Sequence, residues 1–181
     1  RKPCCCGGQI MSHKRQWWFG LVGLGLLGLG WLFGYSGGLD QSRLTYASTV
    51  TDAQGELLHV IMADDERYRL KTQPEDVDAS FVDLLMAYED QRYYQHHGVD
   101  WLAMTRALWQ VASRGYIVSG GSTLTMQVVR LMEPKPRTIW NKLDQMRKAI
   151  ALERSHSKHQ ILALYLSLAP YGSNIEGVQM A

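Results

Sequence analysis

The most chemically dense part of the sequence is the stretch 88–100, which combines carboxylates, an arginine, two histidines and tyrosines. It lies where one apolar helical pattern ends and the next begins, so its polar side chains gather at a helix end. A helix end that serves packing alone needs a cap and a glycine, not this many titratable groups. We therefore interpret Glu89 as a catalytic base. The structural alternative is a solvated helix C-terminus that stops at Gly98.

A second polar stretch, residues 120–127 (GGSTLTMQ), brings free backbone N–H groups and hydroxyls to the start of a predicted helix. This arrangement suits an oxyanion or a phosphate, although ordinary helices are capped in the same way. On a later helix, Lys142 and Arg147 are not one helical turn apart and so do not form a single tight site. A metal site is not predicted, because His96 and His97 are adjacent and project in different directions.

Length, charge and cysteine content bound the remaining possibilities. The 181 residues are enough for one domain of roughly 140 residues and an anchor. The net charge of +2, with no block of like charge, gives no sign of a nucleic-acid-binding face. The three cysteines are adjacent, at positions 4–6, so the main domain is expected to fold without disulfides.

The elements that must position these groups are mainly helical. A β-hairpin is predicted over residues 48–62, with a turn at 52–55, and residues 68–70 add a short strand. Helices are predicted to begin at Asp78, Asp100, Ser122 or Thr123, Thr138 and Ser157. Apolar side chains at helical spacing are expected to face the core; they are Phe81, Leu84, Leu85, Tyr88, Trp101, Met104, Leu108, Val111, Ile139, Leu143, Met146 and Ile150. Trp101 and Trp109 are expected in the core, and contact with the lipid interface is the alternative for both.

The N-terminal part carries a predicted membrane anchor at residues 16–36. Residues 17–35 contain no charge, and their length spans a hydrocarbon core of roughly 30 Å as a helix. Basic residues before the span place a leader, residues 1–15, in the cytoplasm and the rest of the chain outside. A cleaved signal peptide is the alternative. Residues 37–47 form a linker, and residues 48–181 form one domain that we expect to be truncated at its C-terminus.

Taken in order, the polar segments resemble the motifs of the peptidoglycan glycosyltransferases (glycosyltransferase family 51). Residues 89–100 (EDQRYYQHHGVD) and 120–127 resemble the first two motifs, 142–153 (KLDQMRKAIALE) the third, and 158–166 (KHQILALYL) the fourth. Residues 176–178 resemble the start of a fifth. The wording of the second motif is most similar to the 1C subgroup of the class A penicillin-binding proteins.

The resemblance implies a mainly α fold: a lysozyme-like helical lobe with a small membrane-associated jaw and a short N-terminal β-hairpin, after one transmembrane helix. It implies polymerisation of lipid II into glycan strands, with inversion and release of undecaprenyl pyrophosphate, on the outer face of a bacterial inner membrane. Glu89 matches the general base. Substrate-binding positions are matched by Asp90, Arg92, Ser122, Thr123, Gln127, Lys142, Gln145 and Lys158. Of these, Lys142 and Lys158 are expected near the phosphates.

The resemblance also bears on cofactors and partners. It leaves open a divalent cation, Mg²⁺ or Mn²⁺, at the pyrophosphate. The implied partners are lipid II, the lipid-linked glycan strand, the membrane and cell-wall synthesis proteins. A transpeptidase domain is expected in the parent protein.

The sequence departs from the family pattern at several positions. Gln145 stands where a second glutamate is usual, so Glu89 is expected to be the only catalytic carboxylate. Asn141 replaces an arginine, and Ala163 and Ser167 replace a glutamate and an asparagine. Two other functions stay open at this point: a lysozyme-like lytic transglycosylase, and a non-catalytic scaffold for wall synthesis.

Overall fold

A computed structural model describes residues 30, 34, 40, 42, 44–116 and 120–181. The chain divides into two compact units, residues 1–35 and 36–181. Among the described residues, no helix has the length and apolar character needed to cross a membrane. The predicted leader and nearly all of the predicted anchor lie outside the described residues.

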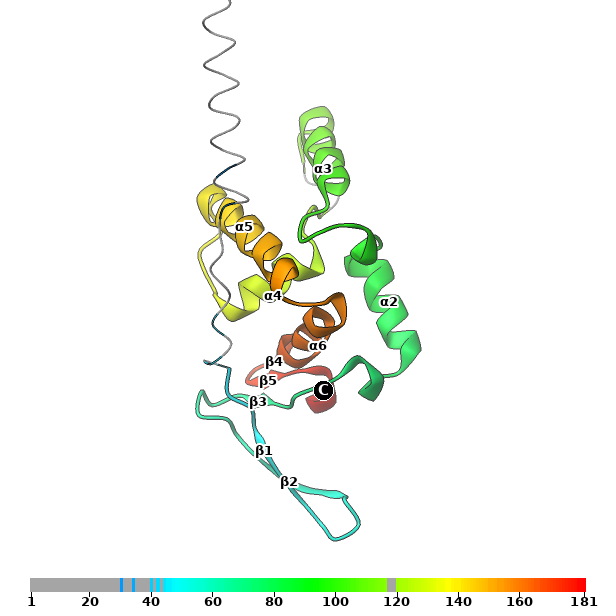
Figure 1. The fold of residues 1–181 in the computed structure, drawn as a ribbon, viewed down its shortest axis with the longest axis vertical. Helices are drawn as coiled ribbons and strands as arrows, with labels where there is room; N and C mark the ends of the chain where they lie inside the picture. Colours follow the sequence, from blue (N-terminus) through cyan, green and yellow to red (C-terminus); the bar gives the residue numbers. More distant parts are fainter. Residues whose placement is uncertain (1–29, 31–33, 35–39, 41, 43, 117–119) are drawn as a thin grey trace, which may run out of the picture. The chain divides into compact units, whose positions relative to one another are not determined.

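The second unit begins with the predicted β-hairpin (Figure 1). Strand β1 (Ser48–Thr51) pairs antiparallel with β2 (Leu57–Ile61), with a register irregularity at Val50 and Thr51. Asp52 closes the turn, because its Oδ1 accepts from the backbone N–H groups of Gln54 and Glu56 at 2.9 and 2.8 Å. The hairpin and its turn are therefore confirmed.

A second, three-stranded sheet joins segments that are far apart in the sequence. Strand β3 (Tyr68–Arg69) pairs parallel with β5 (Ile175–Glu176), which pairs antiparallel with β4 (Pro170–Gly172). Arg69 is buried, and its Nε donates to Glu176 Oε2 at 2.7 Å. This partly buried ion pair fixes the C-terminal strands against the start of the domain.

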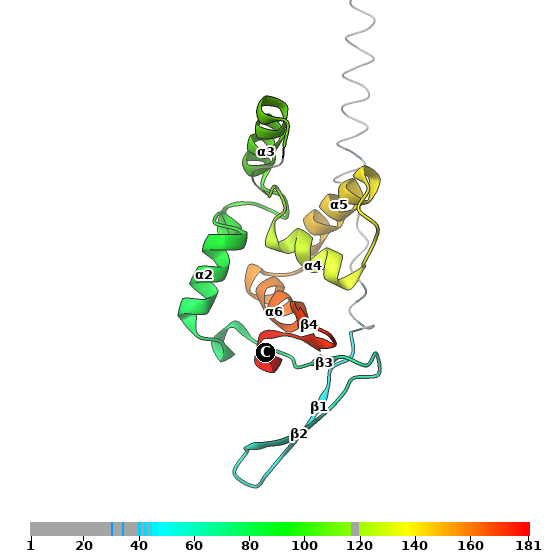
Figure 2. The ribbon, with the colours of Figure 1, turned by 180° about the vertical axis from the view of Figure 1, so that it is seen from behind.

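The core is built around helix α4 (Leu124–Met132), which lies between α5 (Ile139–Ser155) and α6 (Lys158–Leu168) in both views (Figures 1 and 2). Five of the nine residues of α4 are buried, so this short helix is central to the fold. Thr138 and Ser157 cap α5 and α6 as predicted, because local hydrogen bonds to backbone N–H groups decide where a helix begins. The described part of the chain is thus mainly helical with two small sheets.

Helices α2 (Ala79–Glu89) and α3 (Trp101–Arg114) begin at the predicted caps Asp78 and Asp100, but neither contains a fully buried residue. Short 3₁₀ turns at Pro74–Asp76, Tyr93–Gln95 and Val178–Met180 complete the unit. In both views α3 stands apart from α4 and α6 (Figures 1 and 2).

Several side chains predicted to face the core are exposed. The prediction is wrong for Leu84, Tyr88, Trp101, Leu108, Trp109, Val111 and Ile139, which all expose large apolar surfaces. Met146 and Ile150 are buried as expected. The error has a physical cause: helical spacing identifies an apolar stripe, but it does not identify what that stripe contacts.

Candidate active site

Glu89 is the last residue of α2, and its side chain meets α4. Its Oε2 accepts a hydrogen bond from Gln127 Nε2 at 2.7 Å. Its Oε1 forms no hydrogen bond with the residues that the structure describes. The structure thus brings together the predicted base and one predicted substrate-binding residue. One carboxylate oxygen is held, and the other is available to take a proton.

Tyr165 on α6 is a neighbour of Glu89 that sequence reasoning missed. Burial, followed by the negative charge of Glu89, raises the pKa of Tyr165 to about 12, while the positive charge of Arg130 opposes that rise. Tyr165 therefore lies within the electrostatic influence of both the carboxylate and the guanidinium. Gln127 and Arg130 are three residues apart on α4, a spacing that places side chains on one face about 5–6 Å apart. The carboxylate and this cation accordingly belong to one site.

Asp90, next to Glu89, is buried, and its carboxylate contacts protein groups. Its Oδ2 accepts from the backbone N–H of Leu124 at 2.9 Å and lies 3.0 Å from His96 Nε2. Leu124 is the first residue of α4, so the carboxylate sits at the positive end of that helix. Asp90 therefore ties the end of α2, which carries Glu89, to the start of α4.

Thr123 and Arg92 also contact protein groups. The hydroxyl of buried Thr123 donates to the Gly98 carbonyl at 2.6 Å and accepts from the Met126 N–H at 3.2 Å. The guanidinium of Arg92 lies 3.3 Å from Asp100 Oδ1. Gly98 has a φ of +87°, and a Cβ there would lie 2.7 Å from backbone atoms of α5. The Gly98 turn therefore packs directly on that helix, and Thr123 holds it in place.

A second polar cluster surrounds Glu153, whose side chain is almost fully buried. Its Oε1 accepts from Lys158 Nζ at 2.7 Å and from the Thr125 hydroxyl at 2.5 Å, and it lies 3.9 Å from His96 Nδ1. The Lys158 ammonium also lies 4.4 Å from the centre of the Tyr93 ring. In this arrangement Lys158 is held by a buried carboxylate and an aromatic face.

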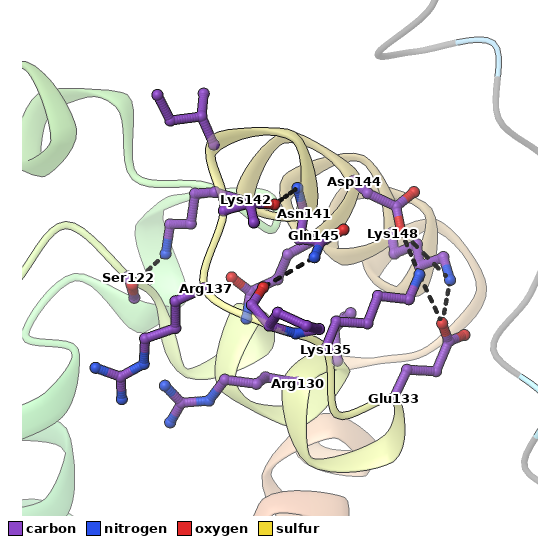
Figure 3. Close-up of a pocket in the computed structure, with 14 residues that line it drawn as sticks. Ser122, Arg130, Glu133, Lys135, Arg137, Asn141, Lys142, Asp144, Gln145 and Lys148 are labelled. Atoms are coloured by element: carbon purple, nitrogen blue, oxygen red, sulfur yellow. Dashed lines mark hydrogen bonds and ion pairs between the residues drawn. The ribbon is translucent and has the colours of Figure 1, made fainter.

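Beyond Arg130, a cavity of about 450 Å³ opens between the end of α4, the following loop and the start of α5 (Figure 3). It is lined by Ser122, Val129, Arg130, Glu133, Lys135, Pro136, Arg137, Thr138, Ile139, Asn141, Lys142, Asp144, Gln145 and Lys148. Three of the predicted site residues, Ser122, Lys142 and Gln145, are thus gathered on its walls. Lys158 is not among its lining residues, so the two lysines expected at the phosphates lie in different clusters.

The cations of this cavity divide into two groups. Lys135 and Lys148 form ion pairs with Glu133 and Asp144, which neutralise them. Arg130, Arg137 and Lys142 pair with no carboxylate in the described part of the chain. In Figure 3 the guanidinium groups of Arg130 and Arg137 extend in the same direction, and Lys142 reaches Ser122. We call these three residues the cationic triad.

The pKa of Lys142 reflects its burial and, after that, the nearby charge of Arg130. Burial and then the charge of Arg130 lower the pKa of Lys142 below its ordinary value. Its Nζ donates to the hydroxyl of Ser122. An anion in the cavity would relieve the mutual repulsion of the cationic triad and favour protonated Lys142. The cavity therefore has the electrostatic character of an anion-binding site.

Gln145 and the carboxylates of the cavity are all engaged by other protein groups. Gln145 Nε2 donates to the Met126 carbonyl at 2.5 Å, which fixes its amide against α4. Glu133 and Asp144 are engaged by lysines. No group of three or more potential metal-binding side chains occurs among the residues that are described. The described side chains alone therefore form no cluster of three ligands, and a divalent cation at a diphosphate would take most of its oxygen ligands from the phosphates and water.

Sequence reasoning missed Arg130, Arg137, Glu153 and Tyr165. The available signal for the first two was a cation at the end of one predicted helix and another just before the next. The signal for Glu153 was its position at the end of the third motif. None of these signals indicates which residues become neighbours, because that depends on the packing of α4 against α5 and α6.

Comparison with known proteins gives the same assignment as the motifs. Residues 54–181 match the Transglycosylase family model. Penicillin-binding protein 1C of Escherichia coli (strain K12) is 42% identical over 114 residues, which cover 63% of this chain and 15% of that protein. Penicillin-binding protein 1A/1B of Bacillus subtilis (strain 168) is 33% identical over 147 residues, covering 79% of this chain and 16% of that protein.

Penicillin-binding protein 1A of Aquifex aeolicus (strain VF5) is 36% identical over 137 residues, covering 75% of this chain and 18% of that protein. The chain thus spans less than a fifth of the length of each of these relatives. The family match extends over most of the chain and includes every polar segment described above. The chain belongs to the transglycosylase family, as its motifs predict.

Proposed function

We propose that this domain polymerises lipid II into peptidoglycan glycan strands and releases undecaprenyl pyrophosphate. One observation carries the proposal. Gln127, which holds the Glu89 carboxylate, lies on the same face of α4 as Arg130. Arg130 lines a cavity with three cations that have no carboxylate partner in the described part of the chain. A base for a hydroxyl and a cationic site for a diphosphate leaving group are the two parts that this transfer requires.

Glu89 acts as the general base. It takes the proton from the 4-hydroxyl of the acceptor sugar, and that oxygen attacks the anomeric carbon of the lipid-linked donor. The new glycosidic bond forms as the bond to the phosphate oxygen breaks, with inversion at the carbon. The diphosphate leaves with the bonding electrons. The Gln127 amide holds one oxygen of Glu89, so the other oxygen is directed to the proton.

The cationic triad stabilises the negative charge that develops on the leaving diphosphate. Lys142 and the Ser122 hydroxyl provide donors at one wall, and Arg130 and Arg137 provide planar guanidinium groups that suit phosphate oxygens. Such preorganised charges lower the barrier because they need little rearrangement when charge develops.

The other predicted substrate-binding residues have a positioning role in this scheme. Asp90, Thr123 and Arg92 each contact a protein group at the end of α2, the start of α4 or the start of α3. Lys158 joins the start of α6 to Glu153 near the end of α5. A direct contact of these residues with the substrate stays a prediction. Gln145 shapes the wall of the cavity through its bond to α4.

We assign the lysozyme-like lobe to α4–α6 and the membrane-associated jaw to α3. Trp109 and Leu108 are exposed on α3, and such an apolar face suits the lipid interface where a polyprenyl substrate resides. We propose an inner-membrane protein with one anchor, a cytoplasmic N-terminus and an extracytoplasmic catalytic domain. Its partners would be lipid II, the growing strand and other wall-synthesis proteins, and a transpeptidase domain would belong to the same protein.

The test supplies labelled lipid II to the purified complete protein, with electrophoresis of the glycan products. The proposal predicts glycan strands longer than the substrate. It also predicts one free undecaprenyl pyrophosphate for each glycosidic bond formed. The family match does not favour a lytic transglycosylase or a scaffold. Shortening of added glycan strands would support the first alternative, and no reaction with either substrate would support the second.

A further inference from the structure

Helix α5 begins with two large apolar side chains that face solvent. Ile139 and Trp140 are 80% and 79% exposed, although helical spacing places Ile139 on the predicted inner stripe. They follow the cap Thr138 directly, so the first turn of the helix presents them beside the loop that bounds the cavity. Adjacent exposed apolar residues rimmed by polar ones commonly mark an interaction site.

The location of this pair relates it to the cationic triad. Ile139 itself lines the cavity, and Lys142 is three residues later on the same face of α5. Arg137 is two residues before Ile139 and also lines the cavity. The cavity wall therefore combines cations that have no carboxylate partner among the described residues with the apolar side chain of Ile139, and the exposed side chain of Trp140 follows directly on α5. We call Ile139 and Trp140 the ledge.

This combination fits an amphiphilic ligand with an anionic head and an apolar chain. A sugar phosphate or a free inorganic anion has no apolar group to contact the ledge. An uncharged lipid has no anionic group to bind the cationic triad. A polyprenyl diphosphate satisfies both, because its chain starts one bond from the phosphate. With the diphosphate on the cationic triad, the first isoprene units can lie over Ile139 and Trp140.

We propose that the ledge formed by Ile139 and Trp140 binds the first isoprene units of the lipid carrier and makes the site selective for polyprenyl over simple diphosphates. The inference rests on the proposed function, since it assigns the carrier end of that same site. The ledge contributes affinity by burial of apolar surface, and the cationic triad contributes affinity by charge. The two contributions can therefore be separated by mutation.

The experiment compares the binding of inorganic pyrophosphate and farnesyl diphosphate to the complete protein held in amphipol. Wild type should bind farnesyl diphosphate about tenfold or more tightly than pyrophosphate, as expected for burial of several apolar groups. The double variant Ile139→Ser, Trp140→Ser should lose most of this preference and keep its affinity for pyrophosphate. The matched control is Leu58→Ser, Ile61→Ser, which removes another exposed apolar pair, on β2.

Three outcomes would overturn the inference. The variant could keep the preference for farnesyl diphosphate, or it could lose both ligands equally, or the control could lose the preference as well. A variant that keeps the preference but binds anionic phospholipid vesicles less well would assign the ledge to the membrane surface instead. Lipid II polymerisation is measured in parallel. If wild type makes no polymer while the double variant still loses the preference for farnesyl diphosphate, the ledge assignment stands and the proposed function is refuted.

Discussion

The hydrogen bond between Gln127 and Glu89 is the contact that orients the proposed base. Gln127→Leu leaves one carboxylate oxygen without its donor and lets the side chain rotate. We expect kcat to fall about tenfold or more, with KM changed less, because loss of such a donor costs about 1–3 kcal/mol. Steady-state polymerisation kinetics measure both constants. A variant with unchanged kcat would show that Gln127 does not orient Glu89.

The cationic triad leads to a prediction about pH. Arg130→Gln removes a positive charge that lowers the pKa of Lys142, so that pKa should rise toward its ordinary value. Lys142 then stays protonated to higher pH. Pyrophosphate binding should be weaker at neutral pH, and its loss on the alkaline side should begin at a higher pH than in wild type.

Calorimetry of pyrophosphate binding from neutral pH to about pH 10.5 tests this at constant ionic strength. The control is Arg114→Gln, at the end of α3 and away from the cavity, which should leave the profile unchanged. An alkaline limit that moves to lower pH in Arg130→Gln would contradict the assigned coupling between the two cations.

Gln145 occupies a position where the family usually has a glutamate, and its local contact predicts what restoring that residue would do. In Gln145→Glu a carboxylate would face the Met126 carbonyl in place of an amide donor, and it would add negative charge to the cavity. We expect a loss of about 1–3 kcal/mol in the free energy of unfolding and weaker pyrophosphate binding. Thermal unfolding and calorimetry measure these effects. Faster polymerisation by a fully stable variant would refute this view.

Residue types in the site were predictable from the sequence, but their groupings were not. The motifs identified Glu89, Gln127 and Lys142 as site residues. They also grouped Lys158 with Lys142, whereas Glu153 holds Lys158 in a separate cluster. The sequence shows which carboxylates could pair with a lysine, and the packing of the helices decides which carboxylate does so.

Among the elements, the junction of α2 and α4 depends on buried Asp90. Asp90→Ala leaves the Leu124 N–H and His96 without their carboxylate, so we expect a loss of about 3 kcal/mol in the free energy of unfolding. Chemical denaturation of the protein measures it. Asp83→Ala is the control, since Asp83 is exposed on the same helix. Equal stability of the two variants would contradict the role of Asp90.

Helix starts were predictable because their causes are local. Asp78, Asp100, Thr138 and Ser157 each accept from a backbone N–H two or three residues ahead. The outward faces of α2, α3 and α5 were not predictable from an apolar stripe. The same spacing produces a core face in one helix and an exposed face in another, depending on its partner.

At the scale of the whole molecule, exposed α3 is expected to meet the membrane. A nitroxide label at Leu108→Cys, in a chain with Cys4, Cys5 and Cys6 replaced by serine, should contact lipid-soluble oxygen in proteoliposomes. A label at Arg106→Cys, on the opposite face of the helix, should contact a water-soluble relaxation agent. Spin relaxation reports both accessibilities. A water-accessible label at position 108 would place α3 away from the lipid.

The pairing of β3 with β5 is the whole-molecule feature that the sequence concealed most. Tyr68–Arg69 alone read as a short strand, but its partner lies more than one hundred residues later, where a two-residue strand has no local signature. The Arg69–Glu176 ion pair joins the same two strands, and only the three-dimensional structure shows that these two residues meet. The cavity is more local, since all its lining residues lie between Ser122 and Lys148.

The most direct test of the account is lipid II polymerisation by Glu89→Gln, measured beside lipid II binding. The amide keeps the size of the side chain but cannot take a proton, and no second carboxylate stands at position 145 to replace it. We predict a fall in kcat of about a thousandfold or more, with lipid II still bound about as tightly as by wild type. A Glu89→Gln protein that polymerises lipid II at the wild-type rate would contradict the central claim.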